Sequence, residues 1–196
     1  MAEYAPVIDE AKKRFNNGWD KVSPAFLGVC LSTIVKYDGE KGYAEVKKIY
    51  ETAPEAIQRT RALVGLGRSK DPKLQLATLN WATDGKSVRA QDVGYALASV
   101  ARTGSDVAWE WLKDNLAHLN KTFPGAKAHV SLIGNLTPSF NTVAHAEKVK
   151  AFIEANNIGS RATTRALERM HTLAHQRARE MKALEAYLKG ANASKL

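Results

Sequence analysis

The chain has 196 residues, of which 44% are hydrophobic and 25% are charged, as is ordinary for a globular protein. Lys and Arg (29) outnumber Asp and Glu (20), and a formal net charge of +9 favours acidic partners, although the interleaving of both signs at helical spacing favours solvated, salt-bridged helix faces. The single cysteine, Cys30, excludes an intramolecular disulfide, and no segment reaches the roughly 18 continuous apolar residues of a membrane span.

Apolar residues recur at spacings of three and four in the first half of the chain, as is typical of amphipathic helices. Ser23 followed by Pro24 predicts a helix start, the pair Asp71–Pro72 predicts another, and Gly67 predicts a helix end. The predicted core includes Val7, Ala11, Phe15, Cys30, Tyr43, Val46 and Tyr50. The predicted helices cover residues 2–15, 23–37, 42–53, 54–67 and 69–83.

The same periodicity continues in the second half, where strand-like alternation is scarce. Ser87 is the predicted N-cap of the next helix, either Asn141 or Thr142 caps a later one, and the last helix is expected to end at Gly190. The predicted core includes Val93, Leu97, Val100, Val107, Trp111 and Leu119. The predicted helices cover residues 87–102, 105–121, 128–136, 141–157 and 160–190.

About ten helices joined by short turns must pack as antiparallel neighbours. We therefore predict an all-α fold of stacked antiparallel pairs, a HEAT-like α-solenoid superhelix. No linker composition interrupts the chain, so we predict a single helical domain over residues 1–190 and a flexible tail over residues 191–196.

The segment "HTLAH" places His171 and His175 one helical turn apart, and zinc peptidases carry histidines with this spacing in H-E-x-x-H. Glu168 lies on the same face, so the three side chains are the secondary candidates for metal ligands. Catalytic zinc normally has three protein ligands, and the position of the peptidase base is occupied by Thr172, which cannot act as a carboxylate base. We therefore predict no metal site and expect these histidines to be packing or surface residues.

From residue 60 onward the sequence resembles the C-terminal helical domain of the aminopeptidase-N and puromycin-sensitive aminopeptidase family. The resemblance extends upstream through "EAKKRFNNG" and "KIYETA" and covers roughly residues 5–190. It depends on the order and spacing of short segments rather than on one decisive motif. These segments are Leu66–Gly67, Asp71–Pro72, "VRAQD" at Val88–Asp92, "AWEWLKDN" at Ala108–Asn115, "SF" at Ser139–Phe140, "VKAFIEAN" at 149–156 and "TTRALERM" at 163–170.

The resemblance implies a bowl of HEAT-like helical pairs that closes over a separate catalytic domain and lines its peptide-substrate chamber. The zinc ion, its ligands and the general base belong to that catalytic domain. This chain carries no H-E-x-x-H, so we expect no catalytic residue and no cofactor of its own, and no peptidase activity when it is alone. The implied partners are the aminopeptidase catalytic domain, or another protein, and a peptide substrate.

Arg89, Gln91 and Asp92 are the candidate substrate-binding residues. We expect them in the first turns of a helix, where free N–H groups and the helix dipole favour an anion. The resemblance places this region toward the chamber, where Arg89 could bind a peptide carboxylate through two hydrogen bonds. The alternative is that Asp92 stabilises the helix N-terminus and that Arg89 is solvated.

Two other functions stay open. The helical stack could be a stand-alone scaffold for protein interaction, or the basic last helix could bind nucleic acid, which we disfavour because its cations do not all share one face. Trp81, Trp109 and Trp111 are expected in helix contacts rather than as base-stacking platforms. The N-terminus lacks a signal-peptide pattern, so we expect a cytoplasmic protein without membrane association, and the C-terminal Ser194–Leu196 tripeptide "SKL" keeps a peroxisomal location open.

Overall fold

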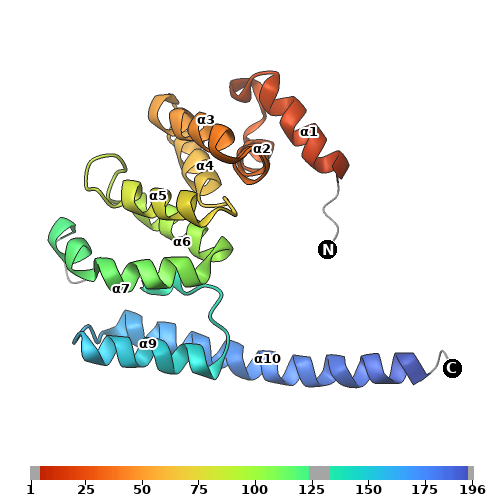
Figure 1. The fold of residues 1–196 in the computed structure, drawn as a ribbon, viewed down its shortest axis with the longest axis vertical. Coiled ribbons are helices and arrows are strands. Elements are labelled where there is room, and N and C mark those ends of the chain that lie inside the picture. Colours follow the sequence, from red (N-terminus) through yellow and green to blue (C-terminus); the bar gives the residue numbers. More distant parts are fainter. Residues whose placement is uncertain (1–4, 124–132, 194–196) are drawn as a thin grey trace. The chain divides into compact units, whose positions relative to one another are not determined.

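The computed structural model describes residues 5–123 and 133–193 of the chain, and every regular element in these residues is a helix (Figure 1). The predicted all-α class is therefore confirmed. The helices are α1 (Ala5–Asn16), the 3-10 helix η1 (Trp19–Lys21), α2 (Pro24–Tyr37), α3 (Gly39–Thr52), α4 (Ala56–Leu66), α5 (Pro72–Ala82), α6 (Val93–Thr103), α7 (Ser105–Thr122), α9 (Val143–Ala155) and α10 (Arg161–Ala193).

The chain forms two compact units, Met1–Pro138 (unit 1) and Ser139–Leu196 (unit 2). We describe each by itself. The prediction of one domain over residues 1–190 stays a prediction, as does the HEAT-like superhelix. None of the helices in the described ranges is long and apolar enough to cross a membrane.

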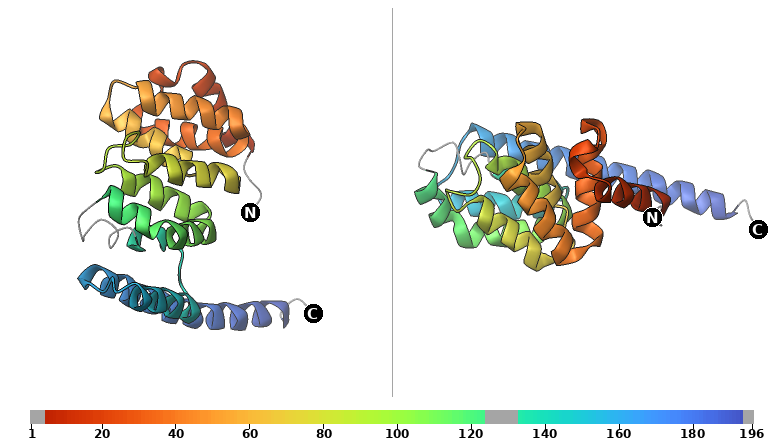
Figure 2. Two further views of the ribbon diagram at one scale, coloured as in Figure 1. Left: turned by 60° about the vertical axis from the view of Figure 1, so that its left-hand side comes forward. Right: turned by 90° about the horizontal axis from the view of Figure 1, so that it is seen from above.

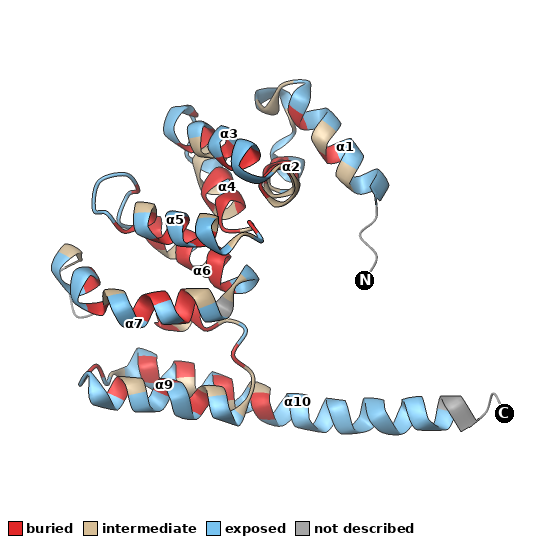
Figure 3. Cartoon of the chain, in the orientation of Figure 1, coloured by how far each residue is buried: buried red, intermediate tan, exposed pale blue. Residues whose placement is uncertain are grey.

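In unit 1 the even-numbered helices form a continuous row, in which α2 packs on α4 and α4 packs on α6. Helix α1 packs on α2, helix α3 packs on α2 and α4, and helices α5 and α7 pack on α6 and on each other. Figure 2 shows this layered arrangement of unit 1 from two more directions. The apolar stripes face inward (Figure 3), so residues such as Leu31, Val46, Leu63, Leu97 and Trp109 are buried.

Small residues allow the helices of this row to approach one another closely. A Cβ atom added at Gly42 of α3 would lie 2.4 Å from the Ile34 carbonyl oxygen of α2. One added at Gly65 of α4 would lie 3.3 Å from the Leu31 Cβ atom of α2. Since interiors are packed at crystal-like density, these positions have little room for a side chain.

Local hydrogen bonds explain where several helices begin. Asp71 accepts a hydrogen bond from the Lys73 backbone N–H (2.8 Å) at the start of α5, with Pro72 in the first position, as the sequence predicts. Thr142 accepts from the His145 backbone N–H (3.2 Å), so of the two predicted caps of α9 it is Thr142 that acts.

Three expectations differ from the structure. Helix α6 begins at Val93 rather than near Ser87, because the Ser87 hydroxyl donates to Asp84 (2.6 Å) within a loop instead of capping a helix. Val7 is 53% exposed rather than buried, while Ala11 and Phe15 form the buried face of α1. Gly190 does not end the last helix.

In unit 2, α9 packs on the first part of α10. The imidazole of His145 stacks on the Phe140 ring, with centroids 4.3 Å apart. From His175 to Gly190 every residue of α10 is exposed, as its second half shows in Figure 3. The helix runs to Ala193, three residues into the predicted flexible tail, and Ser194–Leu196 lie outside the described residues.

Candidate functional site

Unit 1 contains a groove of about 760 Å³ between α1, α2, α4 and α6. Its described lining residues include no Asp or Glu, whereas five of them carry a positive charge. We call it the cationic groove, and its cations are Lys36, Arg61, Arg68, Lys70 and Arg102. A concave surface lined by charges of one sign concentrates ligands of the opposite sign.

The side chain of Arg61, on α4, lies over Gly28 of α2. A Cβ atom added at Gly28 would be 3.3 Å from Cδ of Arg61, so the absence of a side chain there leaves room for the aliphatic part of the arginine. Both residues line the cationic groove. The close packing of α4 on α2 therefore brings a guanidinium from one helix over the surface of the other.

The turn between α4 and α5 positions two more cations. Ser69 is buried, its hydroxyl accepts from the Asp71 backbone N–H (3.1 Å), and its carbonyl accepts from the Gln75 side chain (2.8 Å). The residues on either side of Ser69, Arg68 and Lys70, both line the groove. Anchoring Ser69 inward thus holds its two basic neighbours at the groove.

Gln75 also links this turn to the end of α6. Its Oε1 atom is buried without a hydrogen-bond partner, and a Cβ atom added at Gly104 would lie only 2.2 Å from it. Arg102 stands in the last turn of α6, immediately before this contact. The side chain of Gln75 therefore contacts both the turn that carries Arg68 and the end of α6, which carries Arg102.

The acidic residues next to the groove in sequence have other roles. Asp38 at the end of α2 bonds Lys12 Nζ (2.5 Å), and Asp71 caps α5. The half-buried ring of Tyr37 has the Nζ atoms of Lys36 and Lys70 at 5.0 and 5.7 Å from its centroid, within cation–π range. No Asp or Glu is among the described lining residues of the groove.

Guanidinium groups bind carboxylates through paired, charge-assisted hydrogen bonds, and ammonium groups add less directional attraction. The groove is thus suited to a carboxylate ligand. Its side chains offer donors and no described carboxylate, imidazole or thiol that could hold a metal ion.

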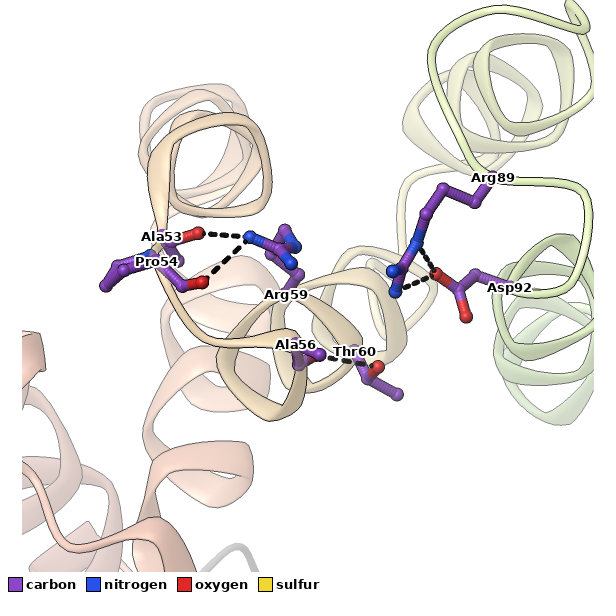
Figure 4. Close-up of polar contacts among 7 residues, drawn as sticks. All are labelled: Ala53, Pro54, Ala56, Arg59, Thr60, Arg89 and Asp92. Carbon is purple, nitrogen blue, oxygen red and sulfur yellow. Dashed lines mark hydrogen bonds and ion pairs between the residues drawn. The ribbon is translucent and has the colours of Figure 1, made fainter.

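The predicted candidates Arg89, Gln91 and Asp92 lie together, but in the turn that precedes α6 rather than in its first turns. Arg89 donates to the Asp92 carboxylate from Nε (2.7 Å) and from a terminal nitrogen (2.6 Å), as Figure 4 shows. The Asp92 side chain is 9% exposed, that of Arg89 is 46% exposed, and Gln91 is exposed. The structure therefore gives Arg89 an internal partner; its binding of substrate stays a prediction.

This turn packs near the end of α3. Burial raises the pKa of Tyr50, an effect that a hydrogen bond from the Arg89 backbone opposes. The Tyr50 ring meets Trp81 edge-on at 5.1 Å, and Lys47 lies over that indole at 5.0 Å. Nearby, Arg59 donates to the carbonyl oxygens of Ala53 (2.7 Å) and Pro54 (3.1 Å), also drawn in Figure 4. The cluster thus consists of satisfied structural contacts.

The other candidates take different places. On α10, His171 is half-buried, and Glu168 and His175 are exposed. Across residues 5–123 and 133–193, no three His, Cys, Asp or Glu side chains form a group able to hold a metal ion, and the expectation that this trio binds none stays a prediction. Trp109 and Trp111 are buried, as predicted for helix contacts.

Sequence reasoning missed the cationic groove. Its five cations spread from residue 36 to residue 102, and no local pattern sets them apart. Arg61 has no acidic residue three or four positions away, but Arg102 has Asp106 at that spacing, like an ordinary solvated pair. Only the packing of three helices identifies the set.

Comparison with known proteins gives a consistent family. Residues 1–172 match the family described as "ERAP1-like C-terminal domain". Aminopeptidase M1-B of Oryza sativa subsp. japonica is 34% identical over 132 residues, which are 66% of this chain and 15% of that protein. Aminopeptidase 2, mitochondrial, of Saccharomyces cerevisiae is 28% identical over 158 residues, 77% of this chain and 16% of the relative. Endoplasmic reticulum aminopeptidase 2 of Bos taurus is 25% identical over 158 residues, which are 78% of this chain and 17% of that protein.

The chain thus spans 15% to 17% of the length of these relatives. The match to the family covers most of the chain, including all the groove residues and the turn of Arg89 and Asp92. It agrees with the resemblance seen in the sequence. The chain belongs to the ERAP1-like C-terminal domain family of aminopeptidases.

Proposed function

We propose that this chain is a non-catalytic domain that closes and shapes the peptide chamber of a separate zinc aminopeptidase catalytic domain, and that its cationic groove binds the C-terminal carboxylate of the peptide. Membership of the family supports the first part. The second part depends on one observation: five cations and no described acidic side chain line one groove. An aminopeptidase acts at the N-terminus of a peptide, so a site for the opposite end would position the substrate without contacting the reacting atoms.

Arg68 is the best-placed residue for this contact. It is half-buried, and its turn is anchored by Ser69 and Gln75. A guanidinium on an anchored turn has less conformational freedom to lose when it forms a paired hydrogen bond with a carboxylate. Arg61, held across Gly28, can contribute a second donor group.

The proposal is tested by fluorescence anisotropy with a labelled ten-residue peptide that ends either in a free carboxylate or in an amide. We expect the free acid to bind about tenfold more tightly, since a charge-assisted hydrogen bond contributes about 1.4 kcal/mol at a half-exposed site. Arg68→Gln should remove most of this difference. Arg165→Gln, which neutralises an exposed cation on α10, should leave it unchanged.

Equal affinity for the acid and the amide would contradict the proposed contact. The absence of catalysis is tested separately with a chromogenic amino-acid amide and added zinc. We expect no turnover above a zinc-only blank, because the sequence has no H-E-x-x-H. Zinc-dependent hydrolysis by the isolated chain would overturn the non-catalytic assignment.

A further inference from the structure

The second half of α10 carries exposed apolar side chains on one face. Every residue from His175 to Gly190 is exposed, and the large apolar ones among them are Met181, Leu184, Tyr187 and Leu188. We call these four residues the distal stripe. We infer that the distal stripe binds a second copy of this chain, whose own α10 lies against it in the antiparallel direction. The inference concerns unit 2 and is independent of the cationic groove.

The distal stripe continues the face of α10 that α9 covers. Met170 and Ala174 are buried in the first part of the helix, on which α9 packs. From Met170 the same face continues at positions 174, 177, 181, 184 and 188, in steps that alternate between four and three. This alternation is the spacing of helices that pack along another helix. The face is therefore patterned for a helical neighbour beyond its contact with α9.

A hollow of about 340 Å³ lies where the covered and exposed parts of this face meet. Its lining residues are Asn141, Leu173, Gln176, Arg177, Glu180 and Met181. Two contacts fix its walls: Arg177 donates to Asn141 (2.9 Å), just before α9, and Gln176 donates to Glu180 (2.7 Å). The hollow therefore combines apolar side chains with a carboxylate that can accept a further hydrogen bond.

Tyr187 has the position and chemistry to fill this hollow in another molecule. Its side chain is 71% exposed. Positions 173, 180 and 187 are seven residues apart, so Tyr187 lies along the same edge of the stripe as the hollow. It stands about 15 Å beyond Arg177 along the helix axis, too far to reach the hollow of its own chain. An aromatic ring with a hydroxyl suits a hollow that offers both apolar contact and an acceptor.

A projection and a hollow on one edge of one helix complement each other through a two-fold axis. An axis perpendicular to α10 between residues 182 and 183 exchanges position 177 with position 188. It brings Tyr187 of each copy to the hollow of the other and sets Met181 against the partner's Leu184. Both contacts form twice, as in the isologous interface of a symmetric dimer.

The charges beside the distal stripe favour the antiparallel direction. Glu180 and Glu185 lie on opposite edges of the stripe. A parallel pair would bring Glu180 of each copy opposite the partner's Glu185, and like charges at these flanking positions repel. The antiparallel pair instead places Glu185 on the same side as the partner's Lys182, so that opposite charges face each other twice.

A lipid surface fits the distal stripe less well than a second copy does. Helices that lie on membranes have a continuous apolar face, with Lys and Arg on the polar face. Here Arg177 interrupts the apolar face itself, and Glu180 and Glu185 flank it on both sides. Anionic headgroups would meet these carboxylates, whereas a second α10 supplies groups that pair with them.

The size of the contact sets the expected affinity. The 16 residues from His175 to Gly190 form about 24 Å of a helix that is about 10–12 Å across. The buried strip is therefore roughly 250 Å² on each copy, well below the about 800 Å² per partner of a standard interface. We expect a weak dimer with a dissociation constant on the order of 100 µM.

Sedimentation equilibrium of the full chain, from about 10 µM to about 1 mM, measures this association. Leu184→Glu should raise the dissociation constant at least about tenfold, since it places a charge in the centre of both copies of the contact. Ala186→Glu is the matched control, because it adds the same charge to an exposed position on the opposite face of the same helix. Circular dichroism establishes that both variants keep their helices.

Pyrene attached to an introduced cysteine reports the direction of pairing, because Cys30 is buried. In the antiparallel dimer the two labels of Glu185→Cys are offset by about 8 Å along the axis, whereas those of Lys189→Cys are offset by about 20 Å. We expect excimer fluorescence from the first variant and little from the second. Equally strong excimer signals at both positions indicate a parallel pair and overturn the inference.

Two further outcomes would also overturn it. A chain that stays monomeric at 1 mM does not use the distal stripe for a second copy. A dimer that Leu184→Glu leaves unchanged forms through another surface. Vesicles of phosphatidylcholine and phosphatidylserine provide the lipid arm: we expect no binding, and if a monomeric chain binds them and Leu184→Glu abolishes that binding, the stripe belongs to a membrane surface.

Discussion

Gly67 ends α4, and replacing it with alanine is expected to destabilise the chain for a reason that lies on another helix. Its φ and ψ angles, −70° and −3°, are available to every residue, so no left-handed conformation requires glycine here. An added Cβ atom would instead lie 2.6 Å from the Ser99 Cβ atom and 2.6 Å from the Val100 backbone nitrogen, both on α6. Real Cβ atoms do not approach backbone so closely.

The magnitude follows from three contributions. Overpacking a core contact costs about 1–3 kcal/mol. Ser99 Oγ, which would lie 2.7 Å from the new Cβ and donates to the Val64 carbonyl (2.5 Å), would have to move, at a loss of about 0.5–1.5 kcal/mol. Alanine also restricts the unfolded chain more than glycine does, which stabilises the folded state by about 0.4–1 kcal/mol. The expected net destabilisation is about 0.5–4 kcal/mol.

Urea unfolding followed by circular dichroism measures this change. Gly65→Ala is the matched control, because it lies two residues away at the same helix end and its new Cβ would meet the Leu31 Cβ atom at 3.3 Å, which is tight but less severe than the 2.6 Å contacts at Gly67. The higher helix propensity of alanine, worth up to about 1 kcal/mol, should offset much of the free-energy cost of this contact. If Gly67→Ala proves as stable as the unmodified chain, or more stable than Gly65→Ala, the close approach of α4 and α6 is not the reason for glycine.

Two further predictions concern polar contacts of unit 1. Burial raises the pKa of Tyr43 above its ordinary value of 10.0, against the effect of its hydrogen bond with Thr78, so stability present below pH 10 should fall as the pH rises through the folded-state pKa. Tyr43→Phe should flatten that alkaline fall in a pH series of urea midpoints; an unchanged slope would contradict it. Arg89→Gln should destabilise by about 1–3 kcal/mol, since it leaves the buried Asp92 carboxylate without this partner. It should spare peptide affinity, because Arg89 precedes the start of α6 whereas Arg102 lies about 13 Å along that helix. A folded Arg89→Gln chain with weakened peptide binding would instead support the substrate role predicted from the sequence.

The helical elements could be predicted because their signals are local. The start of α5 at Asp71–Pro72 and the buried faces of α3 and α6 follow from residue types a few positions apart. The predicted start of α6 was wrong for an equally local reason. Ser87 can either cap a helix or hydrogen-bond within a loop, and here its hydroxyl donates to Asp84 in the loop.

The candidate site shows the limit of such reasoning. Arg89 and Asp92 were selected together from their positions in the chain, and they do lie together, but as partners of each other. Spacing along the sequence indicates which residues lie close together on one helix or turn. It does not indicate whether the guanidinium of an arginine is paired with another side chain, because the spacing is the same in both cases. The partner of a side chain is therefore known only when its rotamer and surroundings are known.

By itself, the sequence determined the all-α class, most helix boundaries and the family, since each depends on short-range periodicity, capping and the order of local segments. Only the tertiary structure decided which cations share a surface. Arg61, Arg68 and Arg102 meet at one groove because α4 lies against α2 and α6 at glycines whose missing side chains permit the approach. Charges on different helices come together because the helices pack within a few ångströms of one another. The spacing of residues along the chain does not reveal that packing distance.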